Sequence, residues 1–240
     1  MADRRLFAVP RPVSALLVLT FSLQIAMQAS QPAPAARAEA LPVPVTPAML
    51  RVASLDEPIA AAQLLALYLQ AFDNQPGISI PFRDLDYPRV IAWLETILAL
   101  DGIGQYPLLM ASQLYAQVPI EAKQRLMLDF VHRKFREDPA RRWRWLAHAT
   151  IMAKHRLKDN ALALRYADDV ARLAHSAPSW ARQMRIFILE DMGELESATI
   201  LLGGLLATGE LNDPNEIHFL TQRLEQMKKS AEKSTPMSRN

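Results

Sequence analysis

Aromatic residues recur in this sequence at an interval of 37 residues, and this interval most constrains the fold. Tyr106, Trp143 and Trp180 are spaced by 37 residues each time, and they begin the related segments YPLLMASQLY, WRWLAHATIM and WARQMRIFIL. The same interval relates four apolar positions, which are Val90, Met127, Leu164 and Leu201. Several series in one frame indicate a structural repeat.

Each repeat reads as two helices joined by a short turn. Leucine and alanine are abundant and only seven residues are glycine, which favours an all-α protein. The predicted helices span 57–72, 86–100, 106–117, 120–137, 143–156, 159–174, 179–192, 194–207 and 214–229. Because a helical pair cannot bury its apolar face alone, we expect these pairs to stack as an α-solenoid.

The segment from about 57 to 228 resembles the tetratricopeptide-repeat superfamily. That family places a leucine and a small residue three and four positions after an aromatic residue, as in Trp143, Leu146 and Ala147. Its units often close with an acidic residue and a proline, as in Asp138-Pro139. The interval of 37 is longer than the family's repeat of about 34 residues, and Gln183 stands where leucine is expected. The resemblance implies a binding surface along the first helix of each pair.

The N-terminus, residues 1–29, combines basic residues with an apolar run. Arg4, Arg5 and Arg11 precede VSALLVLTFSLQIAM, a pattern typical of a signal peptide or signal anchor. Arginines on this side of the run favour a cytoplasmic N-terminus.

Cleavage and anchoring both stay open. The small-residue sites Ala36-Arg37-Ala38 and Ala38-Glu39-Ala40 lie well beyond the apolar run. We expect an exported, periplasmic protein that is either released or held at the inner membrane through residues 12–29.

Composition divides the rest of the chain into three parts. Residues 30–55 are rich in proline and alanine and predict an extended linker. The helical repeat domain follows over 56–229, and the polar residues 230–240 predict a disordered tail. Within the domain, DNQPGISIPFRDLDYP carries prolines and a glycine that argue against regular structure.

Charge and cysteine content exclude several classes of site. The chain has no cysteine, which excludes disulfides, thiolate metal sites and cysteine nucleophiles. With the first forty residues set aside, basic and acidic residues number 23 each. The pI near 9.0 therefore reflects the targeting segment and says little about partners.

The stretch RKFREDPARRWRWL, from Arg133 to Leu146, contains six basic residues and two tryptophans. Two interpretations are open, a nucleic-acid contact and a joint between helices. The joint is favoured because the aromatic residues fit the packing period, with Phe135 and Trp143 expected to face inward. We therefore expect no nucleic-acid partner.

Other candidate chemistry is weaker. His148 and His155 lie seven residues apart, too far to share a metal ion unless a third ligand such as His175 joins them. The neighbouring carboxylates of Asp168-Asp169 diverge on a helix, and a solvated face explains them. No nucleophile–base motif appears, so we expect no catalytic residue, no cofactor and no enzymatic activity.

Binding is the remaining hypothesis. Arg144, His148 and Met152 form one stripe on their predicted helix, His155 continues it, and Arg185 lies 37 residues after His148. These five residues predict a mildly basic groove for an acidic segment or a terminal carboxylate.

Two functions follow. The first is a non-enzymatic scaffold or adaptor of the bacterial cell envelope that binds an extended or helical protein segment. The alternative is an accessory helical domain of an envelope polysaccharide or peptidoglycan enzyme system.

Overall fold

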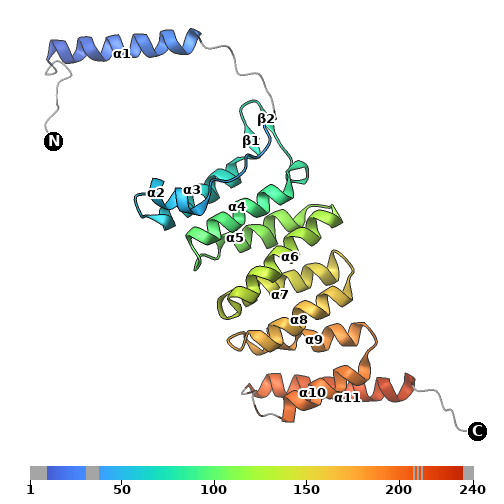
Figure 1. The fold of residues 1–240 in the computed structure, drawn as a ribbon. Helices are drawn as coiled ribbons and strands as arrows, with labels where there is room; N and C mark the ends of the chain where they lie inside the picture. The colour runs from blue at the N-terminus through green and yellow to red at the C-terminus, as the bar shows by residue number, and fades with distance from the viewer. Residues whose placement is uncertain (1–9, 31–37, 208, 210, 212, 235–240) are drawn as a thin grey trace, which may run out of the picture. The chain divides into compact units, whose positions relative to one another are not determined.

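The computed structural model describes residues 10–30, 38–207, 209, 211 and 213–234, and this part of the chain is all-α apart from one short hairpin (Figure 1). The α-helices in these residues are α1 (Arg11–Ser30), α2 (Pro47–Ala53), α3 (Pro58–Ala71), α4 (Tyr87–Leu100), α5 (Tyr106–Leu109), α6 (Glu121–Glu137), α7 (Pro139–His155), α8 (Asn160–Leu173), α9 (Ser179–Asp191), α10 (Leu195–Ala207) and α11 (Pro214–Ser234). The predicted all-α class is confirmed.

Most helix boundaries lie within two residues of the predicted ones, because local signals set them. Aspartates cap three helices, and Oδ1 of Asp159 accepts the backbone N–H of Leu162 at 2.9 Å at the start of α8. α7 begins at Pro139 rather than 143, because Asp138 caps it and a proline suits the first helical position. α11 continues to Ser234, into the segment predicted as a disordered tail; residues 235–240 lie outside the described residues.

The predicted helix 106–117 is not one regular α-helix. After α5 the backbone widens into a π-helical turn, η3 (Met110–Leu114), and then tightens into a 3₁₀ turn, η4 (Tyr115–Gln117). The hydroxyl of Ser112 donates to the carbonyl of Leu108 at 2.8 Å, a side-chain bond of the kind that competes with the helical ladder.

The second half of the predicted linker 30–55 is not a free tether. Leu41 is 2 % exposed, and its carbonyl accepts a hydrogen bond from Nη1 of Arg89 at 2.6 Å. The next carbonyl, of Pro42, accepts from Nε1 of Trp93 at 2.8 Å. α2 follows, with Thr46 as its cap, so burial and side-chain donors from α4 order this segment. Residues 31–37 lie outside the described residues.

The chain separates into two compact units. One unit holds α1 and a hairpin of β1 (Asn74–Gln75) and β2 (Ile78–Ser79), in which Gln75 pairs with Ile78. Gly77 supplies the positive φ that its tight turn needs, so the loop predicted to be irregular contains this short ladder. Within the same unit, the backbone N–H of Glu39 donates to Oε1 of Gln75 at 2.8 Å.

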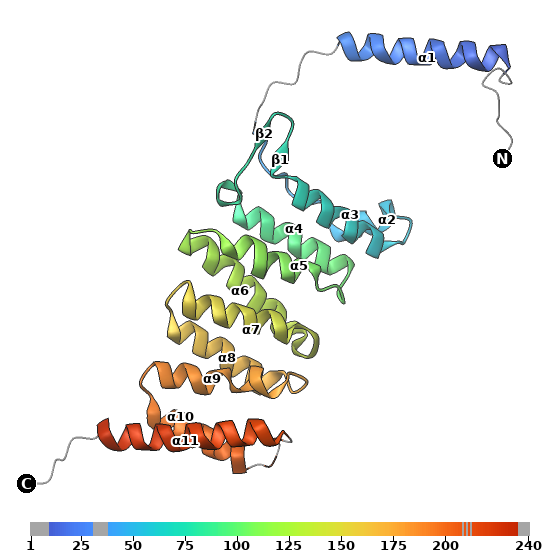
Figure 2. The ribbon, with the colours of Figure 1, turned by 180° about the vertical axis from the view of Figure 1, so that it is seen from behind.

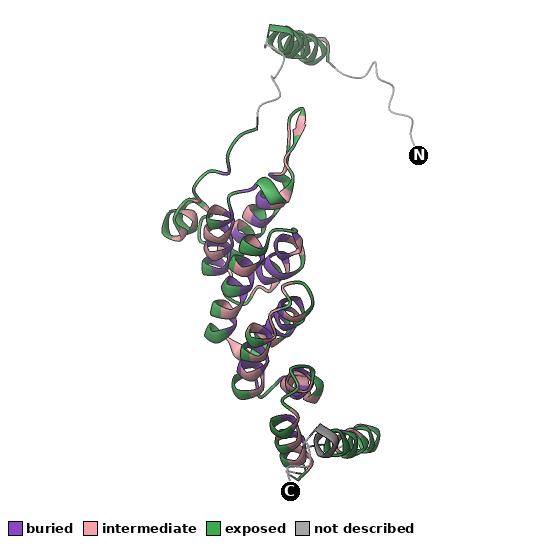
Figure 3. Ribbon diagram, turned by 90° about the vertical axis from the view of Figure 1, so that its right-hand side faces the viewer, coloured by how far each residue is buried: buried purple, intermediate pink, exposed green. Residues whose placement is uncertain are grey.

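α1 is exposed along the part of its length whose side chains are described (Figure 3). Pro12–Ser30 is long and apolar enough to cross a membrane, and a signal sequence has the same character. A signal or anchor segment is therefore compatible with α1. The basic residues before Pro10 lie outside the described residues.

The second unit contains α2 to α11, and successive helices pack against each other in chain order (Figures 1 and 2). Val90 and Met127, two of the repeated apolar positions, are fully buried, whereas Leu164 and Leu201 are partly buried. One core cluster extends from Leu41 to Ile188. A second cluster lies between α9, α10 and α11.

Candidate functional site

The exposed side of α7 carries most of the predicted site residues. Arg144 and His155 are exposed, His148 is half-buried, and Ile151 is 45 % exposed on the same side of the helix. Met152 is 5 % exposed, and its sulfur lies 3.5 Å from Nε2 of Gln117. The predicted stripe was therefore wrong at Met152, because this side of α7 packs against the η3–η4 segment and Ile151 takes the outward position.

Two tryptophans meet beside Arg144. The rings of Trp143 and Trp180 lie 5.8 Å apart, edge to face, and join α7 to α9. The guanidinium of Arg144 lies 5.7 Å from the centre of the Trp143 ring. Trp180 is 53 % exposed, so this cluster of Trp143, Arg144 and Trp180, the tryptophan–arginine surface, is open to solvent.

His148 lies against the backbone of Ser112, in the π-helical turn. Its Nε2 is buried and has no hydrogen-bond partner among the described residues. Burial lowers the pKa of His148, and the backbone hydrogen bond with Ser112 offsets only part of that effect. This imidazole is therefore neutral near pH 7 and adds no positive charge to the surface.

Arg185 lies on α9, where it lines a cavity of about 530 Å³. Nη1 of Arg185 is 3.7 Å from Oδ1 of Asp168 on α8, which neutralises part of its charge. His175 and Arg182 also line the cavity, together with apolar side chains of α10. Arg185 thus faces a partly basic cavity, and the residues that line this cavity include none of the stripe residues of α7.

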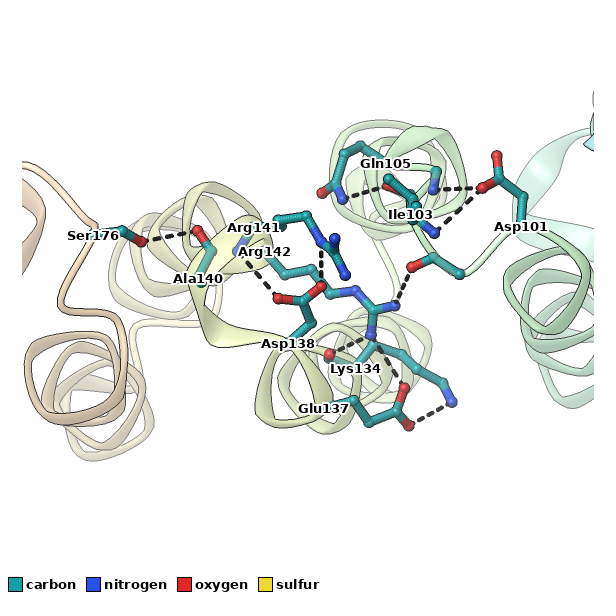
Figure 4. A network of polar contacts seen from close by, with 12 residues as sticks. Asp101, Ile103, Gln105, Lys134, Glu137, Asp138, Ala140, Arg141, Arg142 and Ser176 are labelled. Atoms are coloured by element: carbon teal, nitrogen blue, oxygen red, sulfur yellow. Dashed lines mark hydrogen bonds and ion pairs between the residues drawn. The ribbon is translucent and has the colours of Figure 1, made fainter.

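The basic stretch between Arg133 and Leu146 is mostly paired. Arg142 is 4 % exposed and donates through Nη1 to the carbonyl of Lys134 at 2.7 Å and to the carboxylate of Glu137 at 3.1 Å. Its Nη2 donates to the carbonyl of Gly102 at 3.1 Å (Figure 4). Arg142 therefore fastens the end of α6 and the loop before α5 to the start of α7.

Three more cations of this stretch have carboxylate partners. Arg133 pairs with Asp129 and Glu95, Lys134 with Glu137, and Arg141 with Asp138. Phe135 is fully buried, as predicted, but Trp143 is only half-buried. Trp145 faces inward instead, and its Nε1 donates to Oε1 of Gln105 at 2.7 Å. Trp143 and Met152 were both misassigned for the same reason: the side of α7 that is buried depends on which neighbouring segments pack against it.

Asp169 is not on a solvated face, contrary to the interpretation of the Asp168-Asp169 pair. It is 5 % exposed, and Oδ2 lies 2.6 Å from Nε2 of His132 on α6. Its other oxygen accepts from Nη2 of Arg172 at 2.7 Å. Burial alone would raise the pKa of Asp169, but the hydrogen bonds from His132 and Arg172 hold that pKa below its ordinary value.

A second cavity, of about 390 Å³, lies between α3, α4 and α5, and the sequence patterns did not point to it. Its walls are mainly apolar and include Ala66, Leu67, Ile97 and Pro107. The available sequence signal was the run LLALYL, residues 64–69, which has apolar side chains on every side of its helix. Among the described residues, no three His, Asp or Glu side chains are grouped so that they could hold a metal ion.

Comparisons with known proteins add no assignment. No family model matches the sequence, and the searches of curated proteins and solved structures found no match. The functional conclusion therefore depends on the surfaces described above.

Proposed function

We propose that this chain is a non-enzymatic scaffold of the bacterial cell envelope that binds a protein partner and is held at a membrane by α1. The observation that carries this proposal is the tryptophan–arginine surface. Tryptophan and arginine are enriched at protein interfaces, and at the few interface positions that contribute most of the binding energy. Trp180, at 53 % exposure, leaves a large apolar area in water that a partner can cover.

Helical pairs stacked as a tetratricopeptide-like solenoid are part of the proposal. Two cross-helix ion pairs support it, because each links positions that are one repeat apart. His132 on α6 contacts Asp169 on α8, and Lys154 on α7 contacts Asp191 on α9. Second helices are thus joined to second helices, and first helices to first helices, as stacked repeats require.

The proposed partner segment is acidic. The guanidinium of Arg144 has no carboxylate partner in the described part of the chain, and it already lies against an aromatic ring. A glutamate or aspartate of the partner would gain a charge-assisted hydrogen bond there while its neighbours cover Trp180. Arg185 and the cavity that it lines are a second place for a carboxylate. Nucleic acid is not proposed, because most cations between Arg133 and Leu146 are paired within the protein.

One observation favours the alternative, an accessory domain that guides an envelope polysaccharide or peptidoglycan. Tyr106 is 42 % exposed and Trp180 is 53 % exposed, and both belong to the aromatic series with an interval of 37 residues. Exposed aromatic rings in a row can stack on sugar rings. The same variants test both functions, because a glycan needs Trp180 but gains little from the charge of Arg144.

The test uses the full chain in lipid nanodiscs with a panel of glutamate-rich peptides, lysine-rich peptides and peptidoglycan fragments. We expect glutamate-rich peptides to bind, and Trp180→Ala and Arg144→Glu each to weaken that binding about tenfold. Phe219→Ala is the matched control, because Phe219 on α11 is 56 % exposed and lies outside the surface. Mass spectrometry of the bound peptides should find them intact.

Three results would contradict the proposal. Equal binding by wild type and both variants would remove the tryptophan–arginine surface from the function. Binding of glycan fragments that is lost in Trp180→Ala but kept in Arg144→Glu would favour the alternative. Cleaved peptides would exclude a non-enzymatic role.

A further inference from the structure

The outward side of α3 is apolar. Gln63 is the one exposed polar side chain on this helix. Ala60, Leu64, Leu67 and Ala71 follow one another at helical spacing and are all exposed. Leu64 is 67 % exposed and Leu67 is 60 % exposed. The opposite side of α3 packs on α4 through Ala62, Ala66 and Leu69. α3 is therefore apolar on both sides, and only one side is covered.

Exposed apolar side chains also follow one another along α2 and the turn between the two helices. Met49 is 65 % exposed, Val52 is 79 % exposed and Leu55 is 88 % exposed. Leu55 and Asp56 both have positive φ, at 51° and 66°, an unfavourable backbone for residues other than glycine. We call the exposed apolar side chains of this region the α2–α3 face; they are Met49, Val52, Leu55, Ile59, Ala60, Leu64, Leu67, Tyr68 and Ala71.

The other end of the helical unit has a different character. α11 exposes Gln222, Glu225, Gln226, Lys228 and Lys229. Helices at the ends of stacked arrays need a polar outer side to remain soluble. α11 meets this requirement over much of its surface, whereas α3 does not. The α2–α3 face is therefore expected to be covered in the working protein.

Chain continuity favours a lipid bilayer as the covering partner. The residues between Ser30 and Pro47 number 16, a length that reaches at most about 60 Å, so α2 stays within reach of any membrane that α1 enters. α2 and α3 together are as apolar as a membrane segment, but they are bent by 112°.

The scarcity of charged residues and the length of α3 also favour the bilayer surface as the covering partner. Between Leu41 and Phe72 the only charged residues are Arg51, Asp56 and Glu57. Nη2 of Arg51 donates to the carbonyl of Ala99 at 2.7 Å and is thereby directed at the protein. The 14 residues of α3 extend for about 21 Å, less than the hydrocarbon core of about 30 Å, so the pair suits the bilayer surface and not a crossing.

We propose that the α2–α3 face is a second membrane contact that lies in the interfacial region of the bilayer. This inference rests on the proposed attachment of α1 to the same membrane. The cavity between α3, α4 and α5 adjoins the face, because the exposed residues Gln63 and Leu67 also line it. Its volume of about 390 Å³ and its mainly apolar walls suit the end of an acyl chain. One face thus combines interfacial contact with a place for a lipid tail.

Because the chain has no cysteine, single-cysteine variants can each carry one nitroxide spin label. The full chain is reconstituted in phosphatidylcholine–phosphatidylglycerol vesicles with a label at Leu64→Cys in the face, Leu19→Cys in α1 or Glu225→Cys in α11. Oxygen concentrates in hydrocarbon and a nickel chelate stays in water. We expect oxygen to collide with the labels at 64 and 19 more often than the chelate does, and the reverse at 225.

A charge on the face provides the second comparison. Adding Leu67→Glu to the chain labelled at position 64 should reverse that preference for oxygen, whereas adding Leu173→Glu should leave it unchanged. Leu173 is the matched control because it is a surface leucine, 40 % exposed, on α8. Circular dichroism should show that both variants keep the helical content of the wild type.

Two outcomes would overturn the proposal. If the chelate reached position 64 as readily as position 225, the face would lie in water. If the label at 64 showed spin–spin broadening that vanished on dilution with unlabelled chain, a second copy would cover the face instead. In either case, oxygen preference at position 19 would leave membrane attachment through α1 intact, and its loss would remove that attachment from the proposed function as well.

Discussion

Nε2 of His132 lies 2.6 Å from Oδ2 of Asp169, which joins α6 to α8 across 37 residues of sequence. Both side chains are largely buried. A carboxylate removed from water must be matched by donors, and Arg172 supplies another at 2.7 Å. The pair is therefore a structural connection between neighbouring helical pairs.

Removing Asp169 should destabilise the protein much more than removing its sequence neighbour. We expect Asp169→Ala to lower the free energy of unfolding by about 3 kcal/mol, because His132 loses its partner in a buried site. Asp168→Ala, which removes a surface pair with Arg185, should cost at most about 1 kcal/mol. Urea denaturation of the two variants measures both values. Equal losses would show that the buried pair contributes nothing special.

Acid should weaken the same connection. The hydrogen bonds from His132 and Arg172 outweigh burial and lower the pKa of Asp169 in the folded state. Its contribution to stability is therefore complete above the unfolded-state pKa of about 3.9 and is lost as pH falls through the lower folded-state value. Between pH ~5 and pH ~2, Asp169→Asn should lose less unfolding free energy than the wild type. If the unfolding free energies of the two proteins fell in parallel with pH, Asp169 would not be the source of this acid sensitivity.

His148 should produce a separate pH dependence. Because burial lowers its pKa in the folded state, the unfolded chain binds more protons, and stability falls as pH decreases below about 6.5. His148→Gln should flatten the stability curve between pH ~7 and pH ~5. The NMR titration of the His148 imidazole gives an independent check, since a midpoint above the ordinary value would have the wrong sign.

Arg142 and Arg141 are adjacent but should behave differently. Arg142→Ala removes the donor from the partly buried carbonyl contacts with Lys134 and Gly102 and one of the two cations from the Glu137 carboxylate, so we expect a loss of about 2 kcal/mol in unfolding free energy. Arg142→Lys should recover little of it, because an ammonium group cannot span the three acceptors. The side chain of Arg141 is 54 % exposed, and Arg141→Ala should cost at most about 1 kcal/mol. Thermal unfolding of the three variants measures their relative stability.

The same substitution should have opposite effects at two glycines. Gly193 joins α9 to α10 with φ of 80°, whereas Gly203 lies within α10, and an added Cβ would meet no atom within 4 Å at either position. The backbone conformation therefore decides the effect of alanine on the free energy of unfolding. Gly193→Ala should destabilise the protein by about 1 kcal/mol, and Gly203→Ala should stabilise it by up to about 1 kcal/mol. Calorimetric midpoints that move in one direction for both variants would refute the explanation.

Local chemistry made the helices predictable. Asp86 and Asp159 are capping residues whose side chains accept a backbone N–H three positions later. Prolines at first helical positions add a second signal that does not depend on the rest of the chain. The π-helical turn at Met110–Leu114 was not predictable in this way, because it interrupts a segment whose apolar pattern is helical throughout.

The candidate site was predictable only in part. Arg144 and His155 are both exposed on α7, as helical periodicity predicts for residues of one stripe, and their role in binding stays a prediction. The prediction that Met152 belongs to the exposed stripe was wrong, and the neighbouring Ile151 is exposed instead. How many residues of α7 are buried depends on the η3–η4 segment that packs against this helix. Trp180 was singled out by the interval of 37 residues, but its exposure depends on which side of α9 the neighbouring helices leave uncovered.

The sequence by itself determined the all-α class, the bounds of most of the long helices and the apolar character of α1. These properties depend on backbone preferences and on side chains a few residues apart. Tertiary structure alone decided that Asp169 is buried beside His132, that Arg142 binds three acceptors, and that the α2–α3 face has no cover within the described residues. Each of these depends on contacts between residues far apart in the chain, for which the local pattern carries no information.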